Sequence, residues 1–336
     1  MINAYAASKP RGTLEPYAYD PGELGRDQIE ITVEHCGICH SDLSMLNNDW
    51  GMSGYPLVPG HEIVGTVAAV GGDVSYLTVG QQVGAGWHAG YCMTCGECLQ
   101  GDHNLCADGI AMIAGHPVHQ GGFADKVRVQ ATAAIALPAQ LDKRTAGPLF
   151  CGGVTVYNPL VQFDVKPWHR VGVIGIGGLG HLALQFCKAW GCEVTAFTSK
   201  PDKRDELLAL GATDTLDSTN ADALADAAGK FDLLLSTVNV TLNWSAYLGT
   251  LSPRGRLHFV GGALEPMNIS AMQLIGTQLT LSGSPVGSPA TIADMLEFAA
   301  RHDIAPQTEH YPLSDVNAAL DHLRSGKARY RVVLDM

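Results

Sequence analysis

Short apolar stretches that alternate with polar and Gly-rich turns make up the first part of the chain. Residues 28–36 (QIEITVEHC) and 62–70 (EIVGTVAAV) are rich in β-branched residues and are followed by Gly-rich turns, which is typical of strands. Residues 122–129 (GFADKVRV) predict another strand, whereas residues 90–106 are crowded with Cys, Gly and polar residues and predict a loop. The pattern predicts a region built from short strands and turns.

The pattern changes near Cys151, after which apolar strand candidates alternate with helical stretches. The predicted strands cover residues 171–176, 193–198, 231–238 and 256–262, and the predicted helices cover residues 179–190 and 202–210. This βαβ rhythm is typical of a parallel, doubly wound sheet. The last residues, 328–336 (ARYRVVLDM), predict a strand that returns to the first region.

Composition narrows the class of protein. With 336 residues, of which 46% are hydrophobic and 16% charged, the chain is long enough for two domains with a sizeable core. The net charge of -12 makes nucleic acid and anionic membranes unfavourable partners. The first residues have no apolar core of a secretory signal, and no apolar run reaches the roughly 20 residues that span a bilayer. We therefore expect a cytoplasmic globular protein.

Nine cysteines without a secretory signal point to metal rather than to disulfides. Four of them have the spacing C-x2-C-x2-C-x7-C in one loop: Cys92, Cys95, Cys98 and Cys106. Four thiolates can close a tetrahedral shell around zinc and leave no open position, so the spacing predicts a structural zinc site. An iron–sulfur cluster and reactive thiols are the alternatives, although cluster motifs use other spacings.

The sequence GIGGLG, from Gly175 to Gly180, follows a predicted strand and opens a predicted helix. Gly175 permits the tight turn, Gly177 lets the backbone approach a pyrophosphate, and Gly180 allows close packing of helix and sheet. The N–H groups at the start of the helix then face the anion. In this βαβ context the motif predicts a dinucleotide site; the alternative is a glycine turn without a ligand.

The end of the next predicted strand favours NADP over NAD. NAD enzymes place an acidic residue there for the ribose 2′-OH, but Glu193 lies at the opposite end of the strand. The strand instead ends in Thr198, Ser199 and Lys200, and Arg204 follows, with a planar guanidinium that suits a 2′-phosphate. The alternative is that these cations belong to a solvated helix start.

Three further motifs carry candidate ligands for a catalytic metal: CGICHSD (36–42), GHE (60–62) and LFCGG (149–153). A catalytic zinc needs about three protein ligands and one open position. An isolated His or Cys more often belongs to the core. A His-Glu pair between two Cys motifs, in a chain with a nucleotide site, predicts such a centre.

With these motifs the sequence resembles the zinc-containing medium-chain alcohol dehydrogenases, in the cinnamyl-alcohol-dehydrogenase-like branch that includes bacterial NADPH-dependent aldehyde reductases. CGICHSDLSM, YPLVPGHE, AGPLFCGGVTVY, GVIGIGGLGH and GKARYRVVL carry the resemblance, which extends over essentially the whole chain. It implies an α/β fold with a GroES-like, mostly-β catalytic domain (1–152 and 287–336) and a Rossmann NADP-binding domain (153–286). It also implies a homodimer with two zinc ions per chain that reduces aromatic or aliphatic aldehydes with NADPH. The alternatives are an NAD-linked alcohol or polyol dehydrogenase that acts oxidatively and a non-catalytic zinc scaffold.

The resemblance also assigns residues to the catalytic zinc. It implies Cys39, His61 and Cys151 as ligands, with Glu62 as an alternating fourth ligand, and it leaves Cys36 outside the ligand set. Asp42 is then expected to orient His61. Ser41 is expected to exchange a proton with the substrate oxygen. Many relatives carry a histidine three residues later, where this chain has Ser44, so the proton is expected to leave by Ser44, a water or the cofactor ribose.

Substrate and cofactor contacts complete the expectation. Trp50, with Trp87 or His88, is expected to line the substrate pocket, and plain packing is the alternative for each. His40 is expected near the pyrophosphate and Thr155 against the nicotinamide. The other expected cofactor residues are Gly175, Gly177, Gly178, Leu179, Gly180, Thr198, Ser199, Lys200, Arg204, Thr237, Val260, Gly261, Ser284 and Arg331.

Overall fold

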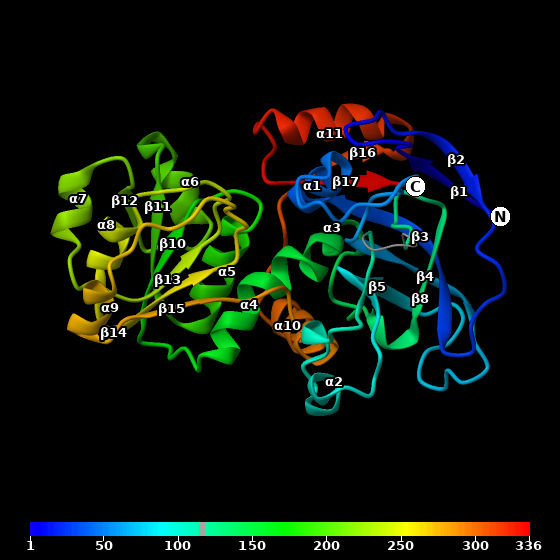
Figure 1. Cartoon of the computed structure of the whole chain (residues 1–336), viewed down its shortest axis with the longest axis horizontal. Coiled ribbons are helices and arrows are strands. Elements are labelled where there is room, and N and C mark those ends of the chain that lie inside the picture. Colours follow the sequence, from blue (N-terminus) through cyan, green and yellow to red (C-terminus); the bar gives the residue numbers. More distant parts are fainter. Residues whose placement is uncertain (114–118) are drawn as a thin grey trace. The chain divides into compact units, whose positions relative to one another are not determined.

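The computed structural model describes residues 1–113 and 119–336, which form two compact units (Figure 1). Unit 1 comprises Met1–Val154 and Val286–Met336, and unit 2 comprises Thr155–Pro285. Helix α4 (Gly152–Gln162) begins in unit 1 and continues into unit 2. Among the described residues, no helix has both the length and the apolar character needed to cross a bilayer.

Unit 1 is built around a mixed seven-stranded sheet. Its strands follow the order β16 (Thr308–Pro312), β17 (Arg331–Asp335), β3 (Gln28–Ile38), β4 (Ile63–Val70), β5 (Gln82–Ala85) and β9 (Ala134–Ala136), with β8 (Lys126–Gln130) paired to β3. Two small sheets pair β1 (Ile2–Ala6) with β2 (Glu15–Tyr19) and β6 (His88–Gly90) with β7 (Ile110–Ala111). Helices of this unit are α1 (His40–Asn47), α2 (Gly96–Gln100), α3 (Lys143–Ala146), α10 (Pro289–Arg301) and α11 (Val316–Arg324).

The long strand β3 lies in the middle of this sheet and pairs with β17, β4 and β8. Ile29, Ile31 and Val33 alternate into the core, and the strand becomes buried on both faces from Cys36 to its end at Ile38. The predicted return of the last segment is confirmed, because β17 pairs antiparallel with β3. The end of β3, where the chain turns into α1, is therefore held from both sides.

Unit 2 contains the predicted parallel sheet. All neighbours are parallel in the order β12 (Asp214–Asp217), β11 (Glu193–Thr198), β10 (Arg170–Ile174), β13 (Phe231–Ser236), β14 (Leu251–Phe259) and β15 (Thr280–Gly283). The connecting helices are α5 (Gly180–Trp190), α6 (Arg204–Ala209), α7 (Ala221–Asp226), α8 (Trp244–Gly249) and α9 (Ala271–Thr277). The central strands are nearly continuous buried runs, as expected for a sheet covered on both faces.

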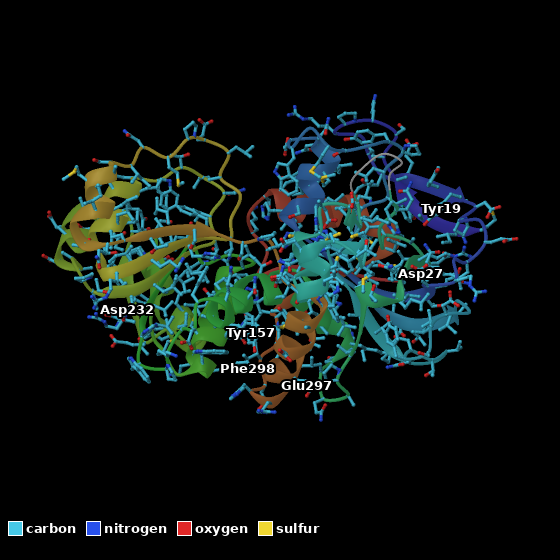
Figure 2. All side chains as sticks on the ribbon, turned by 60° about the horizontal axis from the view of Figure 1, so that its bottom comes forward. Tyr19, Asp27, Tyr157, Asp232, Glu297 and Phe298 are labelled. Carbon is cyan, nitrogen blue, oxygen red and sulfur yellow. The ribbon has the colours of Figure 1, made fainter. Side chains whose placement is uncertain are left out.

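Side-chain contacts fasten the elements of unit 2 to one another. Asp232 on β13 accepts hydrogen bonds from the Arg170 backbone N–H (2.8 Å) and the Ser252 hydroxyl (2.9 Å), which links three adjacent strands. Tyr157 on α4 packs against Phe186 and Trp190 of α5 at ring-centroid distances of 5.6 and 5.8 Å. Asp232 and Tyr157 are labelled in Figure 2.

Several element boundaries differ from the sequence prediction, and three of the differences have a clear physical reason. The strand predicted at 122–129 begins only at Lys126, because residues 121–123 bond as a loop to the backbone of residues 58–60. The helix predicted at 202–210 begins at Arg204, after a 3-10 turn over Pro201–Lys203, where proline fixes the backbone. Strand β14 begins at Leu251, earlier than predicted, since a bulge accommodates its Pro and Gly residues.

Candidate functional site

The turn from β3 into α1 presents the Cys39 thiol. Cys39 is the residue that caps α1, and Asp42, three residues on, closes the turn by accepting a hydrogen bond from the Cys39 backbone N–H at 2.8 Å. This reciprocal arrangement satisfies backbone groups at the helix start that would otherwise be orphaned. Cys39 is thereby fixed at a point where both its backbone and its side chain are buried.

Asp42 also orients His61. Its second oxygen accepts from the Gly60 backbone N–H at 2.8 Å and from His61 Nδ1 at 3.0 Å. Gly60 has φ of 105°, and a Cβ there would lie 2.6 Å from Phe123, so only glycine fits this turn. With Nδ1 donating to the carboxylate, His61 Nε2 carries the lone pair. This buried nitrogen has no hydrogen-bond partner within residues 1–113 and 119–336.

Four buried donor atoms converge at this point. Ligand atoms of Cys39, His61, Glu62 and Cys151 lie within 4.8 Å of one another. Two thiols, an imidazole and a carboxylate are a donor set that zinc prefers, and the orphaned His61 Nε2 is aimed into it. Cys36 lies outside this group, and its thiol instead donates to the Gly37 carbonyl at 3.6 Å.

The electrostatics of the group favour a bound cation. A hydrogen bond from the Cys151 thiol, helped by the positive charge of Arg331, holds the pKa of Cys39 well below its ordinary value although burial opposes this. Burial lowers the pKa of His61, but the charge and hydrogen bond of Asp42 outweigh it and raise that pKa. These shifts mean that the group favours a thiolate at Cys39 and a positive charge beside it. Without metal a proton on His61 supplies this charge, and a bound divalent cation would supply it instead.

Arg331 also belongs to this cluster, because it contacts Glu62, and the sequence did not predict this contact. It is 4% exposed, it begins β17, and its guanidinium pairs with Glu62 Oε1. Glu62 Oε2 has no hydrogen-bond partner among the described residues, and it occupies the space beside Gly37 where a Cβ would lie 2.0 Å away. Arg331, predicted among the cofactor residues, therefore lies in unit 1 beside one oxygen of Glu62.

The other predicted site residues of unit 1 differ in their contacts. Ser41 Oγ lies 3.7 Å from Cys39 Sγ, and His40 is exposed at the first position of α1. Trp87 packs edge-on against His61 at 5.2 Å between ring centroids, and Trp50 packs against Trp87 at 6.1 Å. His88 packs against Tyr91 at 5.3 Å between ring centroids, and burial lowers its pKa to about 4.

The four-cysteine loop also brings its donors together. Sulfur atoms of Cys92, Cys95, Cys98 and Cys106 lie within 4.8 Å of one another. Backbone N–H groups point at three of these sulfurs, from Cys95 to Cys92 at 3.3 Å, from Cys98 to Cys95 at 3.4 Å, and from Cys92 to Cys106 at 3.5 Å. Such hydrogen bonds favour the thiolate, and those from the backbone N–H groups of Thr94 and Cys95 lower the pKa of Cys92 to about 6.

In unit 2 the Gly-rich loop joins β10 to α5. Gly175 has φ of 85°, and a Cβ on Gly180 would lie 2.0 Å from the Gly175 carbonyl oxygen. Thr237, from the end of β13, donates to that same carbonyl at 2.6 Å. Beside Gly177 there is nothing within 4 Å of a Cβ position. The loop is therefore closed towards the sheet and open at Gly177, where an anion would approach.

The predicted 2′-phosphate residues lie around the end of β11, and one of them has a competing partner. Thr198 is buried and its hydroxyl accepts from the Lys200 backbone N–H at 3.1 Å, whereas Ser199 and Lys200 are exposed. Arg204 donates to Asp214 at 2.9 Å and to Thr215 at 2.7 Å, both on β12. Asp214 could not be predicted as a partner from the sequence, because the contact depends on how β12 aligns beside α6.

Other predicted cofactor residues lie just after strands β14 and β15 or at the start of α4. Val260 and Gly261 donate their backbone N–H groups to the Ser236 carbonyl at 2.9 and 3.1 Å. Ser284 lies 3.0 Å from His258 Nε2 through its hydroxyl. Thr155 is buried in the first turn of α4.

Two family models match the chain. The alcohol dehydrogenase GroES-like domain matches residues 25–139, and the zinc-binding dehydrogenase model matches residues 178–301.

Relatives and solved structures cover nearly the whole chain. An aldehyde reductase, AdhA, from Synechocystis sp. is 58% identical over 99% of this chain and 98% of its own, and cinnamyl alcohol dehydrogenase 8 from Arabidopsis thaliana is 37% identical over 98% and 94%. The structure of a Sorghum bicolor cinnamyl alcohol dehydrogenase, 37% identical, superposes with a TM-score of 0.96 over 99% and 97% of the two chains. That of the Helicobacter pylori enzyme complexed with NADP(H), 27% identical, gives 0.92 over 100% and 98%.

Proposed function

The chain belongs to the zinc-containing medium-chain alcohol dehydrogenases, in their cinnamyl-alcohol-dehydrogenase-like branch, and we propose that it reduces aldehydes to primary alcohols with NADPH in a reversible reaction. The observation that carries the proposal is the buried group of Cys39, His61, Glu62 and Cys151, with His61 Nε2 aimed into it. The aldehyde reductase that is 58% identical to this chain supports the substrate class.

Zinc fits both donor groups. Cys39, His61 and Cys151 would hold the catalytic ion, with Glu62 as an alternating ligand, and the four-cysteine loop would hold a structural ion that replaces a core the loop lacks. When bound, the catalytic zinc supplies a Lewis acid that polarises a carbonyl oxygen. The Arg331 guanidinium is suited to hold Glu62 when the carboxylate is not a ligand.

The chain's own residues position the reactants and move the proton. Asp42 keeps the His61 ring in the orientation and tautomer that leave Nε2 free. Ser41, on the first turn of α1 beside Cys39, would give its hydroxyl proton to the oxygen of the reduced substrate, which forms the alcohol, and would recover a proton through Ser44, a water or the cofactor ribose. Trp50 and Trp87 would offer an apolar wall to aromatic or aliphatic aldehydes.

NADPH is the proposed cofactor, with NADH disfavoured. The open side of Gly177 and the start of α5 suit a pyrophosphate, and His40 and Thr155 are the proposed contacts nearer the reactive ring. Ser199, Lys200 and Arg204 would bind the 2′-phosphate, for which Arg204 exchanges Asp214 for the ligand. The cofactor supplies the hydride and the protein supplies orientation and electrostatics.

Residues 1–152 and 287–336 are proposed as the catalytic domain and residues 153–286 as the NADP-binding domain. A homodimer is proposed because exposed apolar side chains gather in the segment that leads to the edge strand β15: Leu264, Met267, Met272 and Ile275. A cytoplasmic location is proposed because nine free cysteines, six in candidate metal sites and three in the core, suit a reducing compartment.

A steady-state screen of aldehydes and alcohols with NADPH and NADH, together with zinc analysis, tests the proposed function. We expect NADPH-dependent aldehyde reduction and two zinc ions per chain, corresponding to the two donor groups. Cys151→Ala and His61→Ala should each lower turnover by several orders of magnitude while NADPH still binds, and Cys36→Ala, a buried cysteine outside the group, should retain activity. One zinc per chain and no turnover would indicate a non-catalytic zinc scaffold, and equal efficiency with NADH would favour the NAD-linked alternative.

A further inference from the structure

A third group of metal-binding side chains lies in unit 1 on the strands β16, β17 and β3. His35 and Asp335 are directly opposite each other in the antiparallel pair of β3 and β17. His310 pairs with Val333, two residues before Asp335, in the parallel pair of β16 and β17. Because side chains two residues apart on a strand share a face, the register directs all three side chains to one face of the sheet.

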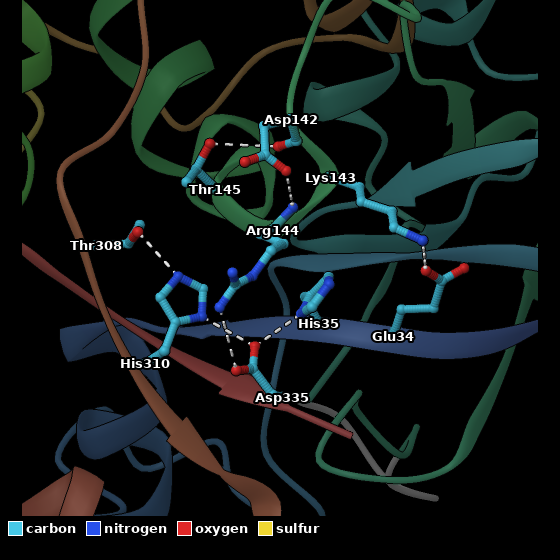
Figure 3. A network of polar contacts seen from close by, with 9 residues as sticks. All are labelled: Glu34, His35, Asp142, Lys143, Arg144, Thr145, Thr308, His310 and Asp335. Carbon is cyan, nitrogen blue, oxygen red and sulfur yellow. Dashed lines mark hydrogen bonds and ion pairs between the residues drawn. The ribbon is translucent and has the colours of Figure 1, made fainter.

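Their donor atoms converge on one carboxylate oxygen (Figure 3). His35 Nδ1 lies 2.8 Å and His310 Nδ1 lies 2.9 Å from Asp335 Oδ1, and the three ligand atoms all lie within 4.8 Å of one another. In a tetrahedral zinc site with ligand bonds of about 2.0–2.1 Å, neighbouring ligand atoms lie roughly 3.3 Å apart. The two contacts with Asp335 are therefore about half an ångström shorter than the spacing that a shared ion requires, so binding needs only a small separation of these atoms.

A bound metal ion would replace the two hydrogen bonds from the histidines to Asp335 and keep the contact between His310 and Thr308. Without metal, each Nδ1–H donates to Asp335, and His310 Nε2 lies 3.0 Å from the Thr308 hydroxyl. With a metal on Nδ1, the proton of each neutral imidazole moves to Nε2. Thr308 can then accept where it previously donated, so His310 stays oriented by a partner on its second nitrogen.

The group is open to solvent, and one positively charged side chain lies beside it. The side chains of His35, His310 and Asp335 are 13%, 19% and 35% exposed, so an ion can reach them from solvent. Burial alone would raise the pKa of Asp335, but hydrogen bonds from His310 and His35 lower it, and the carboxylate is ionised at neutral pH. Arg144 lies 3.9 Å from the second carboxylate oxygen. The positive charge of Arg144 therefore opposes the binding of a metal cation at this group.

We propose that His35, His310 and Asp335 form a third metal site, separate from the two cysteine-containing groups, for a divalent transition-metal ion such as Zn²⁺. Two imidazole nitrogens and one carboxylate oxygen suit zinc and exclude the hard cations that need oxygen ligands only. A bound ion would cross-link three neighbouring strands, including β17, which begins with Arg331, and β3, which ends beside Cys39. Without thiolates and with Arg144 opposing it, this site should bind zinc more weakly than the other two.

Equilibrium dialysis of the zinc-loaded enzyme against free Zn²⁺, followed by metal analysis, tests the proposal. The wild type should take up one zinc per chain beyond the two that the cysteine-containing groups hold, and this uptake should raise the unfolding temperature, since a ligand that binds only the folded state stabilises it. His310→Ala should lose both effects. His302→Ala, which removes an exposed histidine of the same unit from outside the group, should keep both.

Arg144→Gln gives a test that removes no ligand. Loss of the opposing charge should strengthen uptake of the additional zinc several-fold, whereas a plain hydrogen-bonded trio predicts no change. Asp335→Asn repeats the loss test if His310→Ala disturbs folding, which circular dichroism would show. The proposal is overturned if the wild type takes up no further zinc at saturation, if His310→Ala and Asp335→Asn both bind as the wild type does, or if Arg144→Gln leaves the affinity unchanged.

Discussion

Replacement of Asp42 by Asn tests whether this buried carboxylate organises the candidate catalytic site. Asp42 is fully buried and accepts three hydrogen bonds, from the backbone N–H groups of Cys39 and Gly60 and from His61 Nδ1. An asparagine keeps the shape but offers only one accepting oxygen, and its NH2 group must then face an N–H donor. The change therefore removes one charge and misplaces at least one hydrogen bond, with no change in size.

The magnitude follows from this geometry. If the amide oxygen takes the Oδ1 position, the bonds from Gly60 and His61 survive and the Cys39 N–H is left without an acceptor, which costs about 1–3 kcal/mol for a buried donor. The two surviving bonds become neutral and lose about half of their strength. Since His61 is then less firmly oriented, we expect zinc affinity at this site to fall by roughly 10–100-fold.

Zinc release to a chromogenic chelator measures the effect, with thermal unfolding as a parallel readout. Asp42→Asn should release one zinc per chain much faster than the wild type, while the zinc of the four-cysteine loop should stay bound. Asp49→Asn, at an exposed aspartate just after α1, is the matched control and should behave as the wild type. Unchanged release and unchanged stability in Asp42→Asn would refute the role assigned to the carboxylate.

Four other changes should each give a distinct result. Cys95→Ser should lower the unfolding temperature and the zinc content of the loop, because the free energy of zinc binding there contributes to the free energy of folding. Metal analysis and thermal scans would check this. Ser41→Ala should reduce turnover severely with little effect on NADPH binding, and retention of most activity would assign proton delivery to water. Arg204→Ala should raise the Michaelis constant for NADPH by roughly one to two decades, the value of a charge-assisted hydrogen bond, and leave NADH nearly unaffected in steady-state assays. Although burial opposes it, a hydrogen bond from Lys143 lowers the pKa of Glu34 to about 2, so the stabilisation by Glu34 is present above the ordinary carboxyl pKa and is lost as pH falls towards 2. Glu34→Gln should therefore reduce the loss of unfolding free energy between these pH values, and an unchanged pH dependence would contradict this.

Contacts that depend on short sequence spacing could be predicted from the chain alone. Cys92 to Cys106 lie in one loop, and Gly175 to Gly180 lie between one strand and one helix, so neighbouring residues fix the geometry. The alternation of apolar strands and helices likewise predicts the parallel sheet, which the strand pairs of unit 2 confirm. The errors occurred at boundaries where proline or a bulge changes the backbone, as at Pro201 and in β14.

Contacts between residues far apart in the sequence could not be predicted, because they depend on strand register. Glu62 and Arg331 are 269 residues apart, and His35 and Asp335 are 300 residues apart, yet both pairs form because β17 lies beside β3. A shift of one residue in that pairing would turn every side chain of β17 to the other face of the sheet. It would move Arg331 away from Glu62 and Asp335 away from both histidines at once. The register of one short strand therefore determines the guanidinium at the candidate catalytic group and the carboxylate of the proposed third metal site together.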